Sequence, residues 1–155
     1  MQALLTLIAT WLSIQFGLPA TAELPQVERA SAAQMAAVRH HRVAQLQPAH
    51  APGSAAGVDP HAAGEGVFAM YDDATRTIYL DPDWTGTSPA ETSLLVHEMV
   101  HHLQNVAGLK FNCAGEREKD AYRAQRAWLE LFGRTLEGEF GIDPMTLLVR
   151  TNCGF

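Results

Sequence analysis

Residues 88–108 read SPAETSLLVHEMVHHLQNVAG, and this segment carries the strongest structural signal of the 155-residue chain. It begins with Ser-Pro-Ala-Glu, a capping box with proline at the first helical position. Apolar residues then recur at helical spacing, and Gly108 can end the helix. The segment predicts a helix from Ser88 to about Ala107, with one face packed against a core.

The same segment contains the motif HEMVH at residues 97–101. His97 and His101 lie one turn apart on one face of a helix, so both imidazoles can bind one cation. Glu98 lies about 100° round the helix, where it can accept a proton from a water that the metal activates. The motif predicts a catalytic Zn²⁺ site, and two surface histidines without a metal are the alternative. His102 is predicted to pack at the edge of the core.

A catalytic zinc ion takes a third protein ligand, which we expect from the next helix. Residues 114–132 predict that helix, closed by Gly133. The helical wheel places Glu118 on the apolar face, whereas Glu116 and Asp120 point with the charged residues. An ionised carboxylate on an apolar face must be paired or metal-bound. Glu118 is therefore the predicted third ligand, and a buried ion pair with arginine is the alternative.

The motif HEMVHHLQ, followed by EKDAY at residues 118–122, resembles the gluzincin metallopeptidases, including the small M48-like and minigluzincin types. The resemblance covers about residues 67–132. It implies a zinc-dependent endopeptidase with a β-hairpin, an active-site helix and a ligand helix, in that order. Its residue assignments are three zinc ligands and one general base: His97, His101 and Glu118 as ligands, and Glu98 as the base.

The resemblance also implies a residue that forms a hydrogen bond with one of the zinc-binding histidines. Many members of the M48-like type carry an aspartate four residues after the ligand glutamate, where it supports a zinc histidine. Tyr122 stands at that place here, and its hydroxyl is the expected substitute. The stabiliser of the oxyanion remains open among four residues: Tyr71, Tyr79, Tyr122 and His61.

The residues before the motif predict one helix and one hairpin. Residues 27–47 are rich in alanine and predict a helix, which Pro48 ends. Val67–Tyr71 and Thr77–Leu80 are rich in strand-forming residues, and turn residues separate them. Thr77–Leu80 is a candidate edge strand that would pair with an extended peptide, with an ordinary hairpin strand as the alternative. A short helix is predicted after residues 143–144.

The predicted fold class is α+β, with three parts along the chain. Residues 1–22 are the predicted signal peptide, 23–66 an Ala-rich helix with a Pro/Gly/Ala linker, and 67–155 a small zincin-like domain. Four histidines of the second part lie in Ala- or Pro-rich surroundings and are predicted to be solvated: His40, His41, His50 and His61.

The first 22 residues have no charged side chain and resemble an export signal. Ala20 and Ala22 fit the small-x-small rule for cleavage before Glu23. We therefore expect a periplasmic or secreted protein without a stable membrane span, and an uncleaved N-terminal anchor is the alternative. The only two cysteines, Cys113 and Cys153, then predict a disulfide. A pair of metal thiolates is the other possibility.

The composition and net charge of the chain limit the classes of function that we expect. Hydrophobic residues make up 47% of the chain and charged residues 18%, which suits one globular domain. A net charge of −6 without a basic cluster argues against nucleic acid as a partner. The expected function is zinc-dependent hydrolysis of a peptide or protein substrate outside the cytoplasm. The alternative is a non-catalytic zinc-binding or scaffold module that retains the fold.

Overall fold

The computed structural model describes residues 1–38 and 69–154. Its sheet has three described strands: β1 (Gln26–Arg29), β2 (Ala69–Asp72) and β3 (Thr77–Leu80). The strand order is β1-β3-β2, with β3 parallel to β1 and antiparallel to β2. The labelled helices are α1 (Gln2–Phe16), α3 (Pro89–Val106), α4 (Ala114–Glu130), α5 (Leu136–Phe140) and α6 (Pro144–Thr151). The fold is α+β, as predicted.

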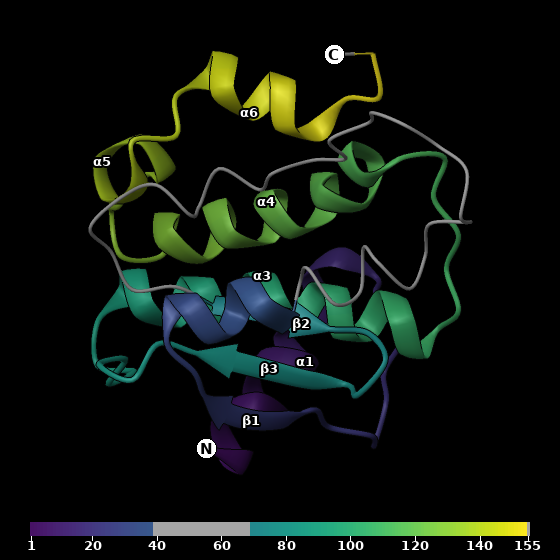
Figure 1. The fold of residues 1–155 in the computed structure, drawn as a ribbon. Coiled ribbons are helices and arrows are strands. Elements are labelled where there is room, and N and C mark those ends of the chain that lie inside the picture. The colour runs from purple at the N-terminus through teal and green to yellow at the C-terminus, as the bar shows by residue number, and fades with distance from the viewer. Residues whose placement is uncertain (39–68, 155) are drawn as a thin grey trace.

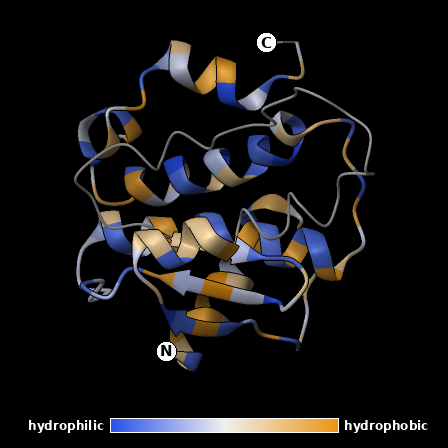
Figure 2. Cartoon of the chain, in the orientation of Figure 1, coloured by the Kyte–Doolittle hydropathy of each residue, from blue (hydrophilic) through white to orange (hydrophobic). Residues whose placement is uncertain are grey.

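The helices are stacked on the sheet in layers. Figure 1 shows α4 between α3 and α6, with α3 next to the sheet. Figure 2 shows hydrophilic residues along α4 and apolar residues on β3. The main core lies between the sheet, α1, α3 and one face of α4, and a smaller cluster lies between α4 and the C-terminal helices. The predicted metal ligands are on α3 and α4, so they lie at the contact of two packed helices.

The two helices of the predicted site are confirmed to within two residues. The Ser88 hydroxyl accepts a hydrogen bond from the backbone N–H of Glu91, and the Glu91 carboxylate accepts one from the backbone of Ser88. Gly108 has a φ of 65°, the left-handed conformation that glycine adopts readily. The short helix after Asp143 is confirmed as α6, whereas α5 was not predicted.

Two expectations about the sheet are wrong. Gln26–Arg29 forms strand β1 instead of the start of a helix, and the described helical residues of this region are 32–38. Because β1 pairs with β3 along its whole length, Thr77–Leu80 is the central strand and has no free edge. Pairing with β3 gives partners to the backbone groups on one side of β1, which outweighs a weak local helix propensity. Among the described strands, β2 is the edge strand that packs against α3.

Several predictions lie outside the described residues. They are the rest of the helix at 39–47, the linker at 48–66, the first two residues of the first strand, and the four histidines His40, His41, His50 and His61.

Helix α1 is part of the hydrophobic core. Leu5, Ile8 and Leu12 are fully buried, and α1 packs against α3. The Trp11 ring meets Trp128 of α4 edge-on, with ring centroids 5.3 Å apart. None of the helices in residues 1–38 and 69–154 has the length and apolar character to cross a membrane. The signal peptide and its cleavage before Glu23 stay a prediction. Because α1 lies within residues 1–22 and packs in the core, the contribution of these residues to stability can be measured.

We expect Leu12→Ala to destabilise the full-length chain by about 2–5 kcal/mol, because it leaves a cavity in the core under α1. Chemical denaturation measures the change, and Ile14→Ala on the exposed side of α1 is the matched control. Equal stability of wild type and Leu12→Ala would show that α1 does not contribute to the folded protein. Mass spectrometry of exported material then reports directly whether the chain begins at Glu23.

Glu91→Gln tests the cap of α3. Burial works to raise the pKa of Glu91, but hydrogen bonds from Thr85 and Ser88 lower it to about 2. The carboxylate therefore stabilises the fold above its unfolded pKa of about 4.5, and this contribution is lost as the pH falls towards 2. We expect Glu91→Gln to cost about 1 kcal/mol at pH 7 and much less at pH 2.5, measured by urea unfolding at both values. An equal loss at both pH values would contradict this role.

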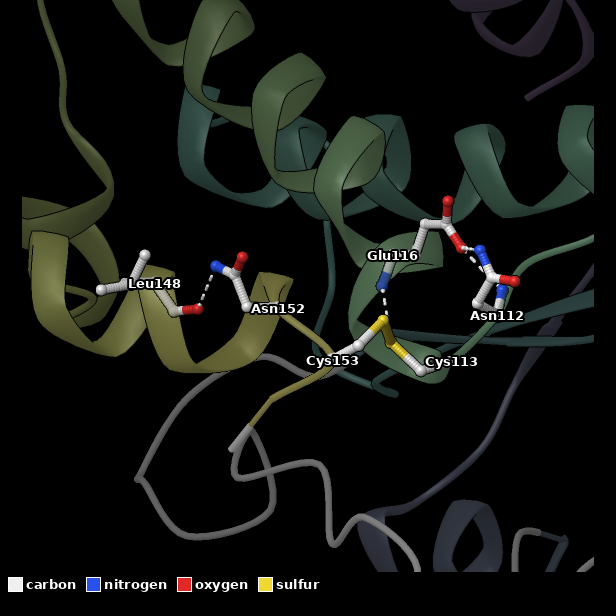
Figure 3. The surroundings of a disulfide bond; sticks show 6 residues. All are labelled: Asn112, Cys113, Glu116, Leu148, Asn152 and Cys153. Carbon is white, nitrogen blue, oxygen red and sulfur yellow. Dashed lines mark hydrogen bonds between the residues drawn. A yellow bond between two sulfur atoms is a disulfide. The ribbon is translucent and has the colours of Figure 1, made fainter.

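Cys113 and Cys153 form the predicted disulfide, with Cα atoms 5.7 Å apart. Figure 3 shows that it joins the start of α4 to the chain just after α6. The two segments are in close contact, since a Cβ on Gly115 would lie only 2.7 Å from the backbone oxygen of Asn152. Closing a loop of this length contributes about 4 kcal/mol in the chain-entropy model. The disulfide thus anchors the beginning of the helix that carries Glu118.

Candidate metal centre

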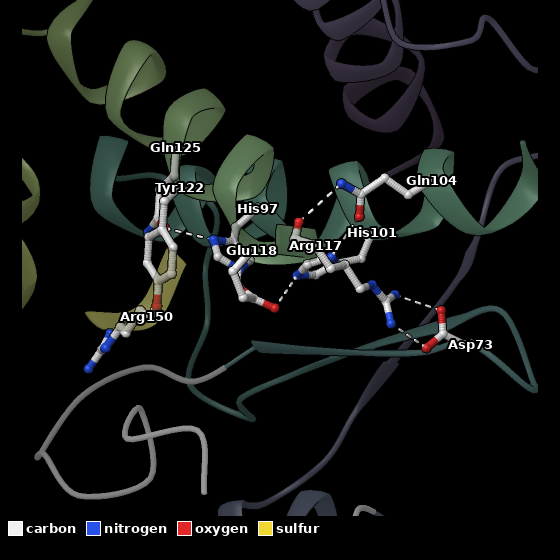
Figure 4. A network of polar contacts seen from close by, with 9 residues as sticks. All are labelled: Asp73, His97, His101, Gln104, Arg117, Glu118, Tyr122, Gln125 and Arg150. Atoms are coloured by element: carbon white, nitrogen blue, oxygen red, sulfur yellow. Dashed lines mark hydrogen bonds and ion pairs between the residues drawn. The ribbon is translucent and has the colours of Figure 1, made fainter. Parts of the chain in front are cut away.

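Three of the predicted site residues converge between α3 and α4. His97 Nε2 lies 3.0 Å from one carboxylate oxygen of Glu118, and His101 Nε2 lies 3.2 Å from the other. One ligand atom from each residue falls within 4.8 Å of the others. Figure 4 shows both imidazoles pointing from α3 towards the carboxylate on α4. His97, His101 and Glu118 therefore form a group that could hold a metal ion.

The local structure explains this convergence. The two histidines are four residues apart on α3, so their rings lie side by side with centroids 5.0 Å apart. The face of α4 that packs on α3 carries Ala121, Gln125 and Trp128, all buried. Glu118 continues that face by one turn towards the start of α4. Its carboxylate consequently projects across the helix contact and reaches both histidines.

The contacts with the two imidazoles also shift the pKa of Glu118. Burial works to raise the pKa of Glu118, but the imidazoles of His101 and His97 hold it far below its usual range. Glu116 and Asp120 are absent from the convergent group. Glu116 instead accepts hydrogen bonds from the backbone and side chain of Asn112. The structure thus brings together the three predicted ligands and leaves Glu116 and Asp120 outside.

Glu98 lies beside the group without belonging to it. Its side chain is largely buried, and it lines the same pocket as the three convergent residues. The other wall of this pocket comes from strand β2. The described residues that line the pocket are Val38, Ala69, Met70, Tyr71, Asp72, His97, Glu98, His101, Arg117 and Glu118. The pocket therefore combines a possible metal site, a carboxylate and a strand edge.

The outer contacts of the histidines come from two glutamines that the sequence analysis did not assign. Gln125 Oε1 lies 3.0 Å from His97 Nδ1, and Gln104 Oε1 lies 3.1 Å from His101 Nδ1. A signal existed for Gln125, since it falls on the apolar face of α4 and a buried amide needs partners. Gln104 gave no comparable signal.

Tyr122 has a different position from the expected one. Its ring meets the His97 ring edge-on at 4.7 Å, whereas its hydroxyl accepts a hydrogen bond from Arg150 of α6 at 2.9 Å. The residue that faces Nδ1 of His97 is Gln125, one turn further along α4. Tyr122 therefore contacts the predicted ligand through its ring.

An ion pair holds Arg117, which lines the pocket, against Asp73. The Arg117 guanidinium donates two hydrogen bonds to Asp73, at 2.6 and 2.7 Å. Burial works to lower the pKa of Arg117, but Asp73 raises it, so the guanidinium stays charged. The pair connects the residue before Glu118 to the turn between β2 and β3, and it places a cation near Glu98 and Glu118.

Of the other candidates for the oxyanion stabiliser, Tyr71 lines the pocket, but its hydroxyl bonds to neighbouring side chains. The Tyr71 hydroxyl donates to His102 Nδ1 and accepts from Asn105, and His102 Nε2 donates to the carbonyl of Glu23 at 2.7 Å. His102 is fully buried, so it packs in the core as predicted. Tyr79 lies on the central strand, outside the described lining of the pocket.

Comparison with known proteins gives a family. The chain belongs to the family described as a domain of unknown function (DUF6647), whose model matches residues 1–154. No curated protein and no solved structure matches the chain.

Proposed function

We propose that this protein is a zinc-dependent peptidase of the gluzincin type. The observation that carries the proposal is the convergence of two imidazole nitrogens and one carboxylate in a pocket that also contains Glu98. Structural zinc sites usually fill all four positions with protein ligands, whereas catalytic sites use three and leave one open. Three ligands with an adjacent carboxylate match the catalytic type.

The donor atoms fit zinc. Ligand atoms at about 2.0–2.2 Å from a tetrahedral ion lie about 3.3–3.6 Å from one another. The Nε2 atoms of His97 and His101 lie 3.0 and 3.2 Å from the oxygens of Glu118, close to that spacing. Nitrogen and carboxylate donors together favour zinc over calcium or magnesium, which prefer oxygen donors alone.

Each residue then has a defined task. Zinc, when bound, supplies a Lewis acid that lowers the pKa of water and polarises a carbonyl. Glu98 accepts the proton of the attacking water and returns it to the leaving amine, which breaks the peptide bond and leaves a carboxylate and an amine. Strand β2, at the edge of the described sheet, forms the opposite wall of the pocket, and we propose that an extended peptide binds along it.

The proposal includes export from the cytoplasm. The Cys113–Cys153 disulfide supports it, because disulfides persist in oxidising compartments. The uncharged first 22 residues are the proposed export signal.

The test uses the purified full-length chain. We expect about one zinc per chain by elemental analysis, and cleavage of casein or a peptide library that a chelator abolishes and added zinc restores. A chain without zinc would contradict the metal centre. Stoichiometric zinc without cleavage of any peptide would favour the alternative, a non-catalytic zinc-binding module.

A further inference from the structure

Two buried glutamines flank the convergent group. Gln104 of α3 and Gln125 of α4 are 1% and 0% exposed. Each histidine faces Glu118 through Nε2 and a glutamine oxygen through Nδ1. A neutral imidazole has a single N–H, so the identity of the protonated nitrogen decides whether the ring can bind a metal through Nε2.

The second contact of Gln104 defines the orientation of its amide. Gln104 Nε2 donates to the backbone oxygen of Arg117 at 3.1 Å. A carbonyl oxygen only accepts, so the amide nitrogen must lie on that side. The amide oxygen then faces His101 and accepts a hydrogen bond from Nδ1–H, which leaves Nε2 as the nitrogen that can bind a metal.

Gln125 is oriented in the same way through a serine. The Ser93 hydroxyl donates to the backbone oxygen of Ala90 at 2.7 Å, so it can only accept from Gln125 Nε2, which lies 3.4 Å away. The Gln125 oxygen therefore faces His97 Nδ1. Both chains of contacts end on backbone carbonyls of helices, which cannot reverse their polarity.

The same contacts cross between the ligand helices in both directions. Gln104 extends from α3 to the backbone of α4, at the residue immediately before Glu118. Gln125 extends from α4 back to His97 and Ser93 of α3. The spacing between the histidines and Glu118 consequently depends on both amides.

We propose that Gln104 and Gln125 are positioning residues, which set the metal-binding tautomer of His101 and His97 and hold α3 and α4 at the spacing of the site before the metal binds. The inference rests on the proposed metal centre. It concerns zinc affinity, which is measured without reference to hydrolysis.

The test compares zinc dissociation constants of full-length variants by chelator competition. Gln104→Leu and Gln125→Leu are each expected to weaken zinc binding by about 10–100-fold, because Nδ1–H loses its acceptor and the ring can rotate. The visible absorption spectrum of the Co²⁺-substituted protein is expected to change with the ligand geometry. Gln125→Glu keeps an acceptor at Nδ1, so its zinc affinity is expected to equal or exceed that of wild type.

The matched control is Thr92→Val. It removes the hydrogen bond from Trp128 Nε1 to Thr92, which also joins α4 to α3 but touches no ligand. Thr92→Val is expected to lower Tm and to change zinc affinity by less than about twofold, as expected for an independent site.

Three outcomes would overturn the inference. They are wild-type zinc affinity in both leucine variants, a loss in Thr92→Val as large as theirs, and a loss in Gln125→Glu as large as in Gln125→Leu. The comparison of Gln125→Glu with Gln125→Leu remains a test even if the leucine variants are less stable, because glutamate has nearly the size of glutamine. His97→Ala distinguishes a failure of this inference from a failure of the proposed function. If His97→Ala also keeps wild-type zinc affinity, the assignment of the metal centre is wrong.

Discussion

Glu98→Gln is expected to lower kcat/KM for peptide cleavage by about 10²–10⁴-fold, the usual contribution of a general base. Glutamine has nearly the volume of glutamate but cannot accept a proton from water. Glu98 lies beside the three convergent residues and is not one of them, so zinc content and Tm are expected to remain close to those of wild type. Activity, metal content and melting temperature are measured on the same preparation.

The control for this experiment is Glu116→Gln. Glu116 has the same chemistry but lies at the start of α4, where it accepts hydrogen bonds from Asn112. It is expected to retain wild-type kcat/KM and zinc content. Full activity in Glu98→Gln would refute the assignment of the base, and loss of zinc in that variant would show that Glu98 acts as a ligand.

His97→Ala, His101→Ala and Glu118→Gln are each expected to weaken zinc binding on the order of 10³-fold, because each removes one of three protein ligands. Zinc that binds only the folded chain stabilises it according to its concentration and affinity. Added zinc is therefore expected to raise the Tm of wild type and to leave the Tm of the three variants almost unchanged. Thermal unfolding with and without a chelator measures both effects.

Glu118→Gln has matched controls on the same helix. Glu116→Gln and Asp120→Asn also remove a carboxylate from α4, but neither residue belongs to the convergent group. Both are expected to keep the zinc-dependent rise in Tm. Should one of them lose it while Glu118→Gln keeps it, the third ligand would be that residue, and the packing of α4 on α3 would differ from the one described.

The parts of the molecule that the sequence predicts well are determined by short-range interactions. The capping box of α3 involves residues three apart, and His97 and His101 are related by one helical turn. Glu118 could be chosen over its neighbours because a helical wheel also depends only on local geometry. Its convergence with the histidines follows once the apolar faces of α3 and α4 pack together.

The errors concern contacts between distant segments. Residues 27–29 look like the start of an alanine-rich helix, yet they pair with β3 some fifty residues later. Strand order depends on which segments meet in the folded chain, so Thr77–Leu80 could not be recognised as central. The same applies to Gln104, whose partners are His101 on its own helix and a backbone oxygen of α4.

By itself, the sequence determined the α+β class, the helices that carry the HEMVH motif and Glu118, and the pairing of the only two cysteines. Those features follow from helix caps, hydrophobic periodicity and composition, which can be read from the sequence without knowledge of the tertiary contacts. The tertiary structure alone decided that β2 is the strand next to the site, that α1 covers the core, and that glutamine amides face the two histidines. These depend on burial, since a polar group needs a particular partner only after packing has removed it from water.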